Sequence, residues 1–410
     1  MKAIRTALLT GTFADLKGRG ARSNRESRFS EAVHEIDPEY LEHAHQAAGR
    51  DENRTVRDFA QSTGIAPQAA LGPAQSRARP GDEDTAWQAP ELVPTIKTCV
   101  TQEQARTIIS RNQSPDVPFD RSINPYRGCE HGCVYCYARP SHAYLGLSPG
   151  LDFETRLFAK SNAAELLDRE LRKPGYQPAM LALGANTDPY QPIEQDLRIT
   201  RSVLQTLAAF GHPVAITTKS ALILRDLDLL QQMARQNLVR VLISIGSLDR
   251  KIARTMEPRA SAPARRLEAI RQLAQAGVPA GVIVAPIIPA LTDQDMEAVL
   301  EAAAKAGACR ASYVVLRLPL EVRDLFVEWL RESAPLRAEH VMSLVRQMRG
   351  GRDYQPGFGT RMKGTGAYAT LLRQRFELAC RRLRIGQQHD ALDCSRFRVP
   401  EPPEAQQRLF

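Results

Sequence analysis

Three cysteines stand close together in the sequence with no fourth cysteine nearby. Cys129, Cys133 and Cys136 have the spacing C-x3-C-x2-C. Thiolates favour soft metals and iron–sulfur clusters, so a compact loop with three of them can bind three irons of a [4Fe–4S] cluster. Such a cluster keeps one iron without a protein ligand. That open iron implies that a further ligand binds there and reacts.

Zinc is the main competing metal for this loop. Structural zinc sites usually have four protein ligands, often as paired C-x2-C knuckles, and only half of such a pair is present here. His131 lies inside the loop and is a possible fourth ligand, although its place between two close cysteines would strain a tetrahedral site. A disulfide is disfavoured, because the set of close cysteines is odd and we identify no secretory signal.

The elements that must position this loop follow a strand–helix pattern. From Asn124 onward, short runs rich in β-branched residues alternate with longer stretches of helical periodicity, as in a parallel sheet. We expect both faces of these strands to be buried, since apolar and polar residues do not alternate along them. The expected strands are 179–184, 213–218, 239–245, 280–286 and 311–316, and the expected helices are 163–171, 196–210, 224–236, 262–276 and 293–306.

One more strand before Cys129 would bring the total to about six. Right-handed strand–helix units of this number are too few for a closed eight-stranded barrel but sufficient for a partial one. The fold class is therefore α/β, with a partial (βα)6 barrel that resembles an incomplete TIM barrel. We expect an N-terminal extension over residues 1–118, the barrel over 119–320, and a helical region with a basic tail over 321–410.

Charge and hydropathy limit the possible partners. The net charge is +9, from 55 Lys and Arg against 46 Asp and Glu, which suits an acidic partner such as nucleic acid. No apolar run has the length needed to cross a bilayer. We therefore expect a cytoplasmic protein without a membrane contact.

Three segments outside the strand–helix pattern are candidates for binding phosphates. The Gly/Arg cluster Lys17–Arg22, followed by Arg25 and Arg28, could bind RNA or the protein's own acidic surface, but we favour a solvated arm. The expected helix 368–384 carries five arginines, for which a solvated face is the commoner cause. The glycine-rich segment 350–366 follows no strand, so we interpret it as an ordered covering loop.

The cysteine motif, with Tyr135 directly before its last cysteine, resembles the signature C-x3-C-aromatic-C of the radical S-adenosylmethionine (SAM) superfamily. The segments 187–192, 217–220 and 243–247 resemble the branch that includes spore photoproduct lyase, and the likeness extends over about residues 120–385. It implies a (βα)6 core, one [4Fe–4S] cluster on the three cysteines, and reductive cleavage of SAM to a 5′-deoxyadenosyl radical. It also implies a cellular reductant such as flavodoxin or ferredoxin.

The resemblance places SAM ligands at the carboxyl ends of the first expected strands. Asn186, Thr187 and Asp188 stand where the family binds the methionyl ammonium, although the usual Gly-Gly-Glu is absent. Lys219 matches a lysine that approaches the SAM carboxylate, and a cation suits that group. A strand-end lysine in solvent is the alternative for Lys219.

Further SAM contacts are implied at later strands and in the cysteine loop. Ser244 matches a serine that contacts SAM, although it could equally form a turn. Ala285 lies in an apolar strand end of the kind that packs an adenine, and core packing would give similar residues. Tyr135 is expected beside the cofactor, with ordinary loop packing as the alternative.

The substrate is the least determined part of the prediction. Tyr137 matches a tyrosine in the hydrogen relay of the lyase and is the candidate catalytic residue. The cysteine that donates hydrogen in the lyase has no counterpart, because no cysteine lies between Cys136 and Cys309. This disfavours the same DNA repair reaction. Cys394 in the tail is the remaining candidate donor.

Two other classes of function compete with a radical enzyme. One is a nucleic-acid-binding protein with a structural or redox-sensing cluster, and the other is a zinc-stabilised binding module. Neither explains the polar residues at successive strand ends, Asn186, Lys219 and Ser244.

Overall fold

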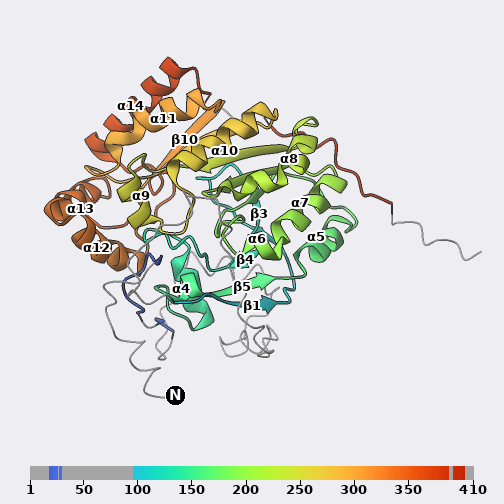
Figure 1. Ribbon diagram of the computed structural model, residues 1–410, viewed down its shortest axis with the longest axis horizontal. Helices are drawn as coiled ribbons and strands as arrows, with labels where there is room; N and C mark the ends of the chain where they lie inside the picture. The colour runs from blue at the N-terminus through green and yellow to red at the C-terminus, as the bar shows by residue number, and fades with distance from the viewer. Residues whose placement is uncertain (1–17, 26, 30–95, 387–390, 402–410) are drawn as a thin grey trace, which may run out of the picture.

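The computed structural model describes residues 18–25, 27–29, 96–386 and 391–401, and Figure 1 draws the remaining segments as a thin grey trace. Lys17, the first residue of the Gly/Arg cluster, lies outside the described residues.

A seven-stranded sheet forms the centre of the molecule, in the order β10-β9-β8-β7-β6-β3-β2. Six of its strands are parallel, and β2 pairs antiparallel with β3 at one edge. The six parallel strands confirm the predicted partial (βα)6 barrel, whose open edges are β10 and β2. The strands are β2 (Ile109–Arg111), β3 (Arg121–Ile123), β6 (Leu181–Leu183), β7 (Val214–Thr218), β8 (Val239–Ser244), β9 (Ala280–Ile287) and β10 (Arg310–Val315).

The helices between the strands lie close to the predicted positions. The predicted helix 196–210 is divided at Arg198, which adopts a left-handed conformation with φ of 52°. Its first turn is α6 (Glu194–Leu197), and a 3-10 segment, η2 (Ala221–Asp226), likewise precedes α8. The main helices are α5 (Ala163–Leu171), α7 (Ile199–Ala209), α8 (Leu227–Ala234), α10 (Pro263–Gln275) and α11 (Met296–Lys305), with α9 (Arg250–Met256) and η3 (Asp293–Asp295) as additional short elements.

The strands carry the apolar core, but not all of them are buried on both faces. Val239, Val241 and Ile243 of β8 are fully buried, as are all three residues of β6. In β7 and β10 buried positions alternate with half-buried ones, so the predicted burial of both faces is wrong for these two strands. Because a partial barrel leaves its interior incompletely filled, one face of such strands stays partly accessible.

A second sheet of three strands carries the cysteine loop. Its order is β1-β5-β4, with β1 (Cys99–Glu103) parallel to β5 (Arg156–Lys160) and β4 (Tyr126–Arg127) antiparallel to β5. The loop runs from β4 to the 3-10 helix η1 (Arg139–Leu145), which is followed by α4 (Asp152–Thr155). Strands β1 and β2 both lie within the range assigned to the N-terminal extension, so that region contributes strands to both sheets.

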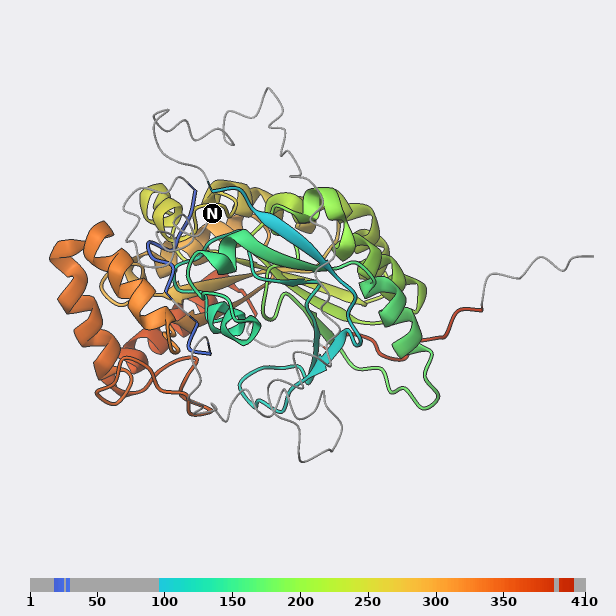
Figure 2. The ribbon, with the colours of Figure 1, turned by 90° about the horizontal axis from the view of Figure 1, so that it is seen from below.

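The C-terminal region adds helices beside the barrel. The helical region predicted over residues 321–410 begins with two helices, α12 (Val322–Ser333) and α13 (Ala338–Gln347), separated by the short η4 (Pro335–Arg337). Pro335 disfavours a helical conformation at the residue before it, and the helix ends there. In Figures 1 and 2, α12 and α13 lie at the opposite end of the molecule from α5 and α7. The last helix, α14 (Gly366–Leu383), packs against α11.

The tail crosses the end of the sheet where the parallel strands begin. The Arg398 amide donates to the Phe210 carbonyl at 2.9 Å, and the Asp393 amide donates to the Asn237 carbonyl at 3.0 Å, just before β7 and β8 start. Figure 1 shows the tail running past α8. Cys394 therefore lies at the opposite end of the barrel from the three-cysteine loop, and its candidate role as hydrogen donor is wrong.

No helix in the described part of the chain is long and apolar enough to span a bilayer.

Candidate metal centre at the carboxyl end of the barrel

The three cysteines form one loop whose thiols are free. Cys129 and Cys133 are buried and Cys136 is half-buried. Among the described residues, no three His, Cys, Asp or Glu side chains are arranged around a single metal ion. Ligands to different irons of a cluster need not converge on one point, whereas structural zinc requires four donors around one ion. The donor set therefore fits an iron–sulfur cluster better than zinc.

Glycines and backbone hydrogen bonds fix the course of the loop. Gly128 and Gly132 have φ of 77° and 66°, a region that favours glycine. A Cβ at Gly128 would lie 2.5 Å from the Leu157 side chain, so the turn also requires close packing. The Cys129 amide donates to the Phe153 carbonyl at 2.9 Å, and the Val134 amide donates to the Met256 carbonyl at 3.0 Å.

A buried ion pair lies beneath the loop. Arg139 and Glu154 are both fully buried and form a salt bridge. Nε of Arg139 donates to the Cys133 carbonyl at 2.8 Å, and Nη1 donates to the carbonyls of Pro149 and Gly150. Every nitrogen of the guanidinium thus has a partner, and one of those partners is the backbone carbonyl of Cys133.

The N-terminal segment formed by residues 18–25 and 27–29 lies against this loop. The Glu154 carboxylate accepts from the backbone amides of Gly20 at 2.9 Å and Ala21 at 2.8 Å. A Cβ at Gly20 would lie only 1.6 Å from the Gly132 carbonyl oxygen, so the two chains touch and this position requires glycine. Sequence reasoning missed this contact, which joins segments more than 100 residues apart.

The arginines of the same segment dock on α12. Arg25 pairs with Asp324 at 2.7 Å and Glu328 at 2.6 Å. Arg28 pairs with Glu321 at 2.6 Å, at the start of α12. Arg22 pairs with Glu332 at 3.3 Å. The favoured interpretation of these arginines as a solvated arm is wrong, because the protein's own acidic helix binds them. Figure 1 shows the segment in blue between α12 and α4.

Asp188 joins three parts of the site through its carboxylate. Oδ1 accepts from the Thr218 hydroxyl at 2.6 Å and Oδ2 accepts from the Lys219 amide at 2.8 Å. The His131 Nδ1 atom lies 3.4 Å from Oδ2. Burial alone would raise the pKa of Asp188, but His131 and these hydrogen bonds outweigh it and lower the pKa to about 2. Asp188 thus orients β6, β7 and the cysteine loop, and both of its oxygens are already engaged.

Lys219 follows β7 and faces the cysteine loop. Its Nζ lies 5.8 Å from the centroid of the Tyr135 ring. Burial would lower the pKa of Lys219, but Cys133 and Glu257 raise it, so the amine stays charged. In the part of the chain that the structure describes, its ammonium has no ion pair.

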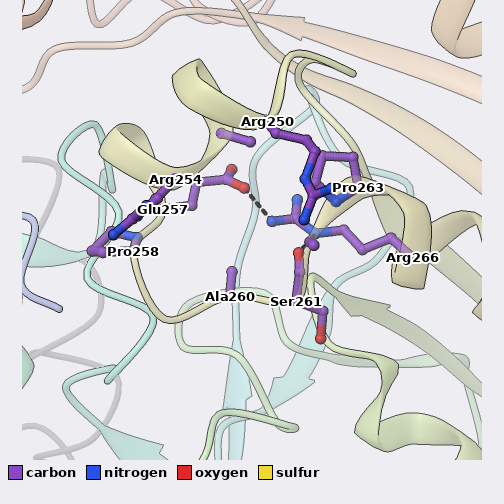
Figure 3. A pocket seen from close by; sticks show the side chains of 10 residues that line it. Arg250, Arg254, Glu257, Pro258, Ala260, Ser261, Pro263 and Arg266 are labelled. Carbon is purple, nitrogen blue, oxygen red and sulfur yellow. Dashed lines mark hydrogen bonds and ion pairs between the residues drawn. The ribbon is translucent and has the colours of Figure 1, made fainter. Parts of the chain in front are cut away.

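Tyr135 is tied to a second buried charge pair. Its hydroxyl donates to Glu257, which also pairs with Arg266. Figure 3 shows Glu257 and Arg266 pointing toward one another across a pocket between α9 and α10. Arg266 also donates to the carbonyls of Ser261 at 2.6 Å and Ser244 at 2.8 Å, so its nitrogens are already engaged. We assign this pocket no ligand.

The other expected SAM residues differ in how free their side chains are. Thr187 is buried, and its hydroxyl donates to the Tyr126 carbonyl at 2.9 Å. Ser244, the last residue of β8, donates from Oγ to the Ala285 carbonyl of β9 at 3.3 Å. Asn186 is half-buried, and in the described part of the chain only its backbone amide is engaged, with Asn124 Oδ1 at 3.1 Å. Among the residues expected to bind SAM at the strand ends, Asn186 and Lys219 are therefore the two whose side chains have unused hydrogen-bonding groups within the described part of the chain.

Tyr137 lies at the open side of the loop. Its hydroxyl donates to the Ala185 carbonyl, just past β6, and its side chain is 43% exposed. The guanidinium carbon of Arg317 lies 5.2 Å from the centroid of its ring. The structure thus brings the Tyr137 side chain to the strand ends beside a cation that sequence reasoning missed.

Comparisons with known proteins agree with this architecture. A model of the radical SAM superfamily matches residues 123–303. Uncharacterised proteins of Mycobacterium bovis and Mycobacterium tuberculosis are each 35% identical over 295 residues, covering 72% of this chain and 80% of the relative. A solved spore photoproduct lyase mutant aligns over 70% of this chain and 80% of its own, with a TM-score of 0.50 and 17% identity, which shows the fold alone. Since the superfamily model covers both the cysteine loop and strands β6 to β9, this chain belongs to the radical SAM superfamily.

Proposed function

We propose that this protein is an enzyme that binds a [4Fe–4S] cluster through Cys129, Cys133 and Cys136 and binds SAM at the open iron. The observation that carries the proposal is the three-thiol loop facing the ammonium of Lys219, which has no ion pair within the described residues. When bound and reduced, such a cluster supplies the electron that cleaves a carbon–sulfur bond of SAM.

The residues around the loop support specific roles. Lys219 would bind the SAM carboxylate, because its charge is directed at the loop and its ammonium has no ion pair within the described residues. The side-chain oxygen of Asn186 would accept from the SAM ammonium. Asp188 and Thr187 would act as positioning residues, since their oxygens are engaged by Thr218, Lys219 and Tyr126. Tyr135 would hold the loop to Glu257.

We further propose a single-electron carrier such as flavodoxin or ferredoxin as the reductant. Nucleic acid remains our candidate substrate, now supported chiefly by exposed arginines of α14 such as Arg373, Arg381 and Arg382. The arginines of the N-terminal segment support it less, because Arg25 and Arg28 are neutralised by acidic residues at α12. A photoproduct lyase reaction is disfavoured by the absence of a cysteine between Cys136 and Cys309.

The test is reductive SAM cleavage by the full chain. We expect anaerobically reconstituted wild-type protein to form 5′-deoxyadenosine with SAM and dithionite, and the Cys133→Ala variant to form none above background. Cys309→Ala is the matched control, because Cys309 is exposed and remote from the loop. Cluster-loaded wild-type protein that yields no 5′-deoxyadenosine would refute the enzyme proposal and favour a structural or redox-sensing cluster.

A further inference from the structure

Arg317 occupies a position that the proposed reaction does not use. It follows β10 by two residues, at the carboxyl end of the barrel, and lies over the ring of Tyr137 with 5.2 Å to the centroid. Tyr137 directly follows the cluster ligand Cys136. A molecule that reacts near the cluster would therefore pass close to this guanidinium.

The N–H donors of Arg317 have few and weak acceptors. Nη2 donates to the Tyr354 hydroxyl at 3.2 Å, and Nη1 contacts the Met362 sulfur at 3.7 Å. The buried Nε has no partner among the residues that the structure describes. Across the described residues, no carboxylate pairs with it. A guanidinium has five N–H donors, and a thioether is a weak acceptor.

Other buried arginines have carboxylate or carbonyl partners for their guanidinium groups. Arg139, Arg266 and Arg361 each pair with a carboxylate, from Glu154, Glu257 and Asp116. Arg349 has no carboxylate partner within the described ranges but donates to the carbonyls of Leu316, Thr360 and Arg361. A partly buried cation without such partners is costly unless a ligand supplies them. Arg317 thus differs from these four buried arginines.

The surroundings of Arg317 are open and positively charged. Tyr137, whose ring faces the guanidinium of Arg317, is 43% exposed. Arg349 lies close enough for Arg317 to contribute, after burial, to lowering the pKa of Arg349 to about 10. An anion that binds beside Tyr137 would contact a guanidinium without a carboxylate partner in the described residues, with the Tyr137 ring on one side.

Resting on the proposed function, we propose that Arg317 binds an oxyanion of the substrate, a phosphate or a carboxylate, against the face of Tyr137. A guanidinium binds either group through two parallel hydrogen bonds, and Arg317 keeps N–H donors that no carboxylate or carbonyl within the described residues accepts. Arg317 is then a specificity-determining residue that holds the charged part of the substrate. The competing explanation is structural, because Tyr354 and Met362 both belong to the glycine-rich loop and Arg317 could serve only to hold it.

Anion binding can be measured without any turnover. We would titrate cluster-loaded full-length protein, without reductant, with dimethyl phosphate, inorganic phosphate and 13C-labelled acetate, and follow the 31P or 13C linewidth. We expect saturable broadening with at least one probe in wild-type protein, and binding weaker by about ten-fold or more in Arg317→Gln. The probe that binds best distinguishes a phosphate-bearing substrate from a carboxylic acid.

Two further variants separate binding from folding. Arg323→Gln is the matched control, because Arg323 also contacts the glycine-rich loop, through Asp353 at 2.9 Å, but is paired and exposed. We expect it to bind the probes as wild type does. Arg317→Lys keeps the positive charge but lacks the planar, paired N–H donors of a guanidinium. It should bind the probes weakly while retaining the wild-type melting temperature. Equal binding by Arg317→Gln and wild type, or no binding of any probe to wild type, would overturn the proposal. Since SAM is absent, this result is independent of whether the protein cleaves SAM.

Discussion

Substitution of Arg139 with methionine is expected to lower the free energy of unfolding by about 3–5 kcal/mol, because it leaves the fully buried charge of Glu154 without its cation. Methionine fills part of the volume of the arginine but can donate no hydrogen bond to the carbonyls of Cys133, Pro149 and Gly150. The measurement is equilibrium denaturant unfolding of the full chain under anaerobic conditions, together with the iron content after reconstitution.

The control for this prediction is Arg271→Met. Arg271 pairs with Glu268 on the surface of α10, and both side chains are substantially exposed. Exposed pairs contribute only about 0–1 kcal/mol. If Arg139→Met were no less stable than Arg271→Met, the charge pair beneath the cysteine loop would have no special role in holding it.

Replacing Gly20 with valine should expose the cluster loop. A side chain at this position would meet the Gly132 carbonyl oxygen at 1.6 Å, so the N-terminal segment must move away from the loop. Once it moves, Glu154 loses the two backbone amides that it now accepts from. We expect the reconstituted cluster to bleach in air about ten-fold or more faster, since local opening controls access to buried groups. The decay of its visible absorbance gives the rate.

Gly357→Val is the matched control for this experiment. Gly357 lies in the glycine-rich loop, and a Cβ there would meet only the Thr360 hydroxyl at 3.6 Å. The same change of residue type should leave the bleaching rate close to that of the wild type. A Gly20→Val variant that bleaches no faster than Gly357→Val would show that the N-terminal segment does not shield the loop.

The sequence was sufficient to predict the elements that are marked by short motifs or by the periodicity of apolar residues. The cysteine spacing, the six parallel strands and most helices follow from short motifs and apolar periodicity, and α5 ends where it was predicted to end. The strand β1 was missed because its residues are mostly exposed and its partner β5 lies more than 50 residues away. Pairing of that kind leaves no periodic signal in the strand itself.

In the candidate site, too, the positions of residues along the fold could be predicted, whereas their side-chain contacts could not. Resemblance placed Asn186, Asp188 and Lys219 at the correct strand ends, but it could not show that the Asp188 oxygens are consumed by Thr218 and the Lys219 amide. Binding of the N-terminal arginines to the protein's own acidic surface was considered only as an alternative, because ion pairs such as Arg25 with Glu328 join residues about 300 positions apart. Arg317 stands out only once its lack of an ion pair within the described residues is seen.

The most direct test of the central claim is electron paramagnetic resonance of the reduced cluster with and without SAM. If the three-thiol loop leaves one iron open, SAM must bind that iron and change the spectrum of the reconstituted wild-type protein. We expect a cluster signal that SAM alters at saturating concentration. A reduced cluster whose spectrum is identical with and without SAM would contradict the open iron, and with it the assignment of this site to SAM chemistry.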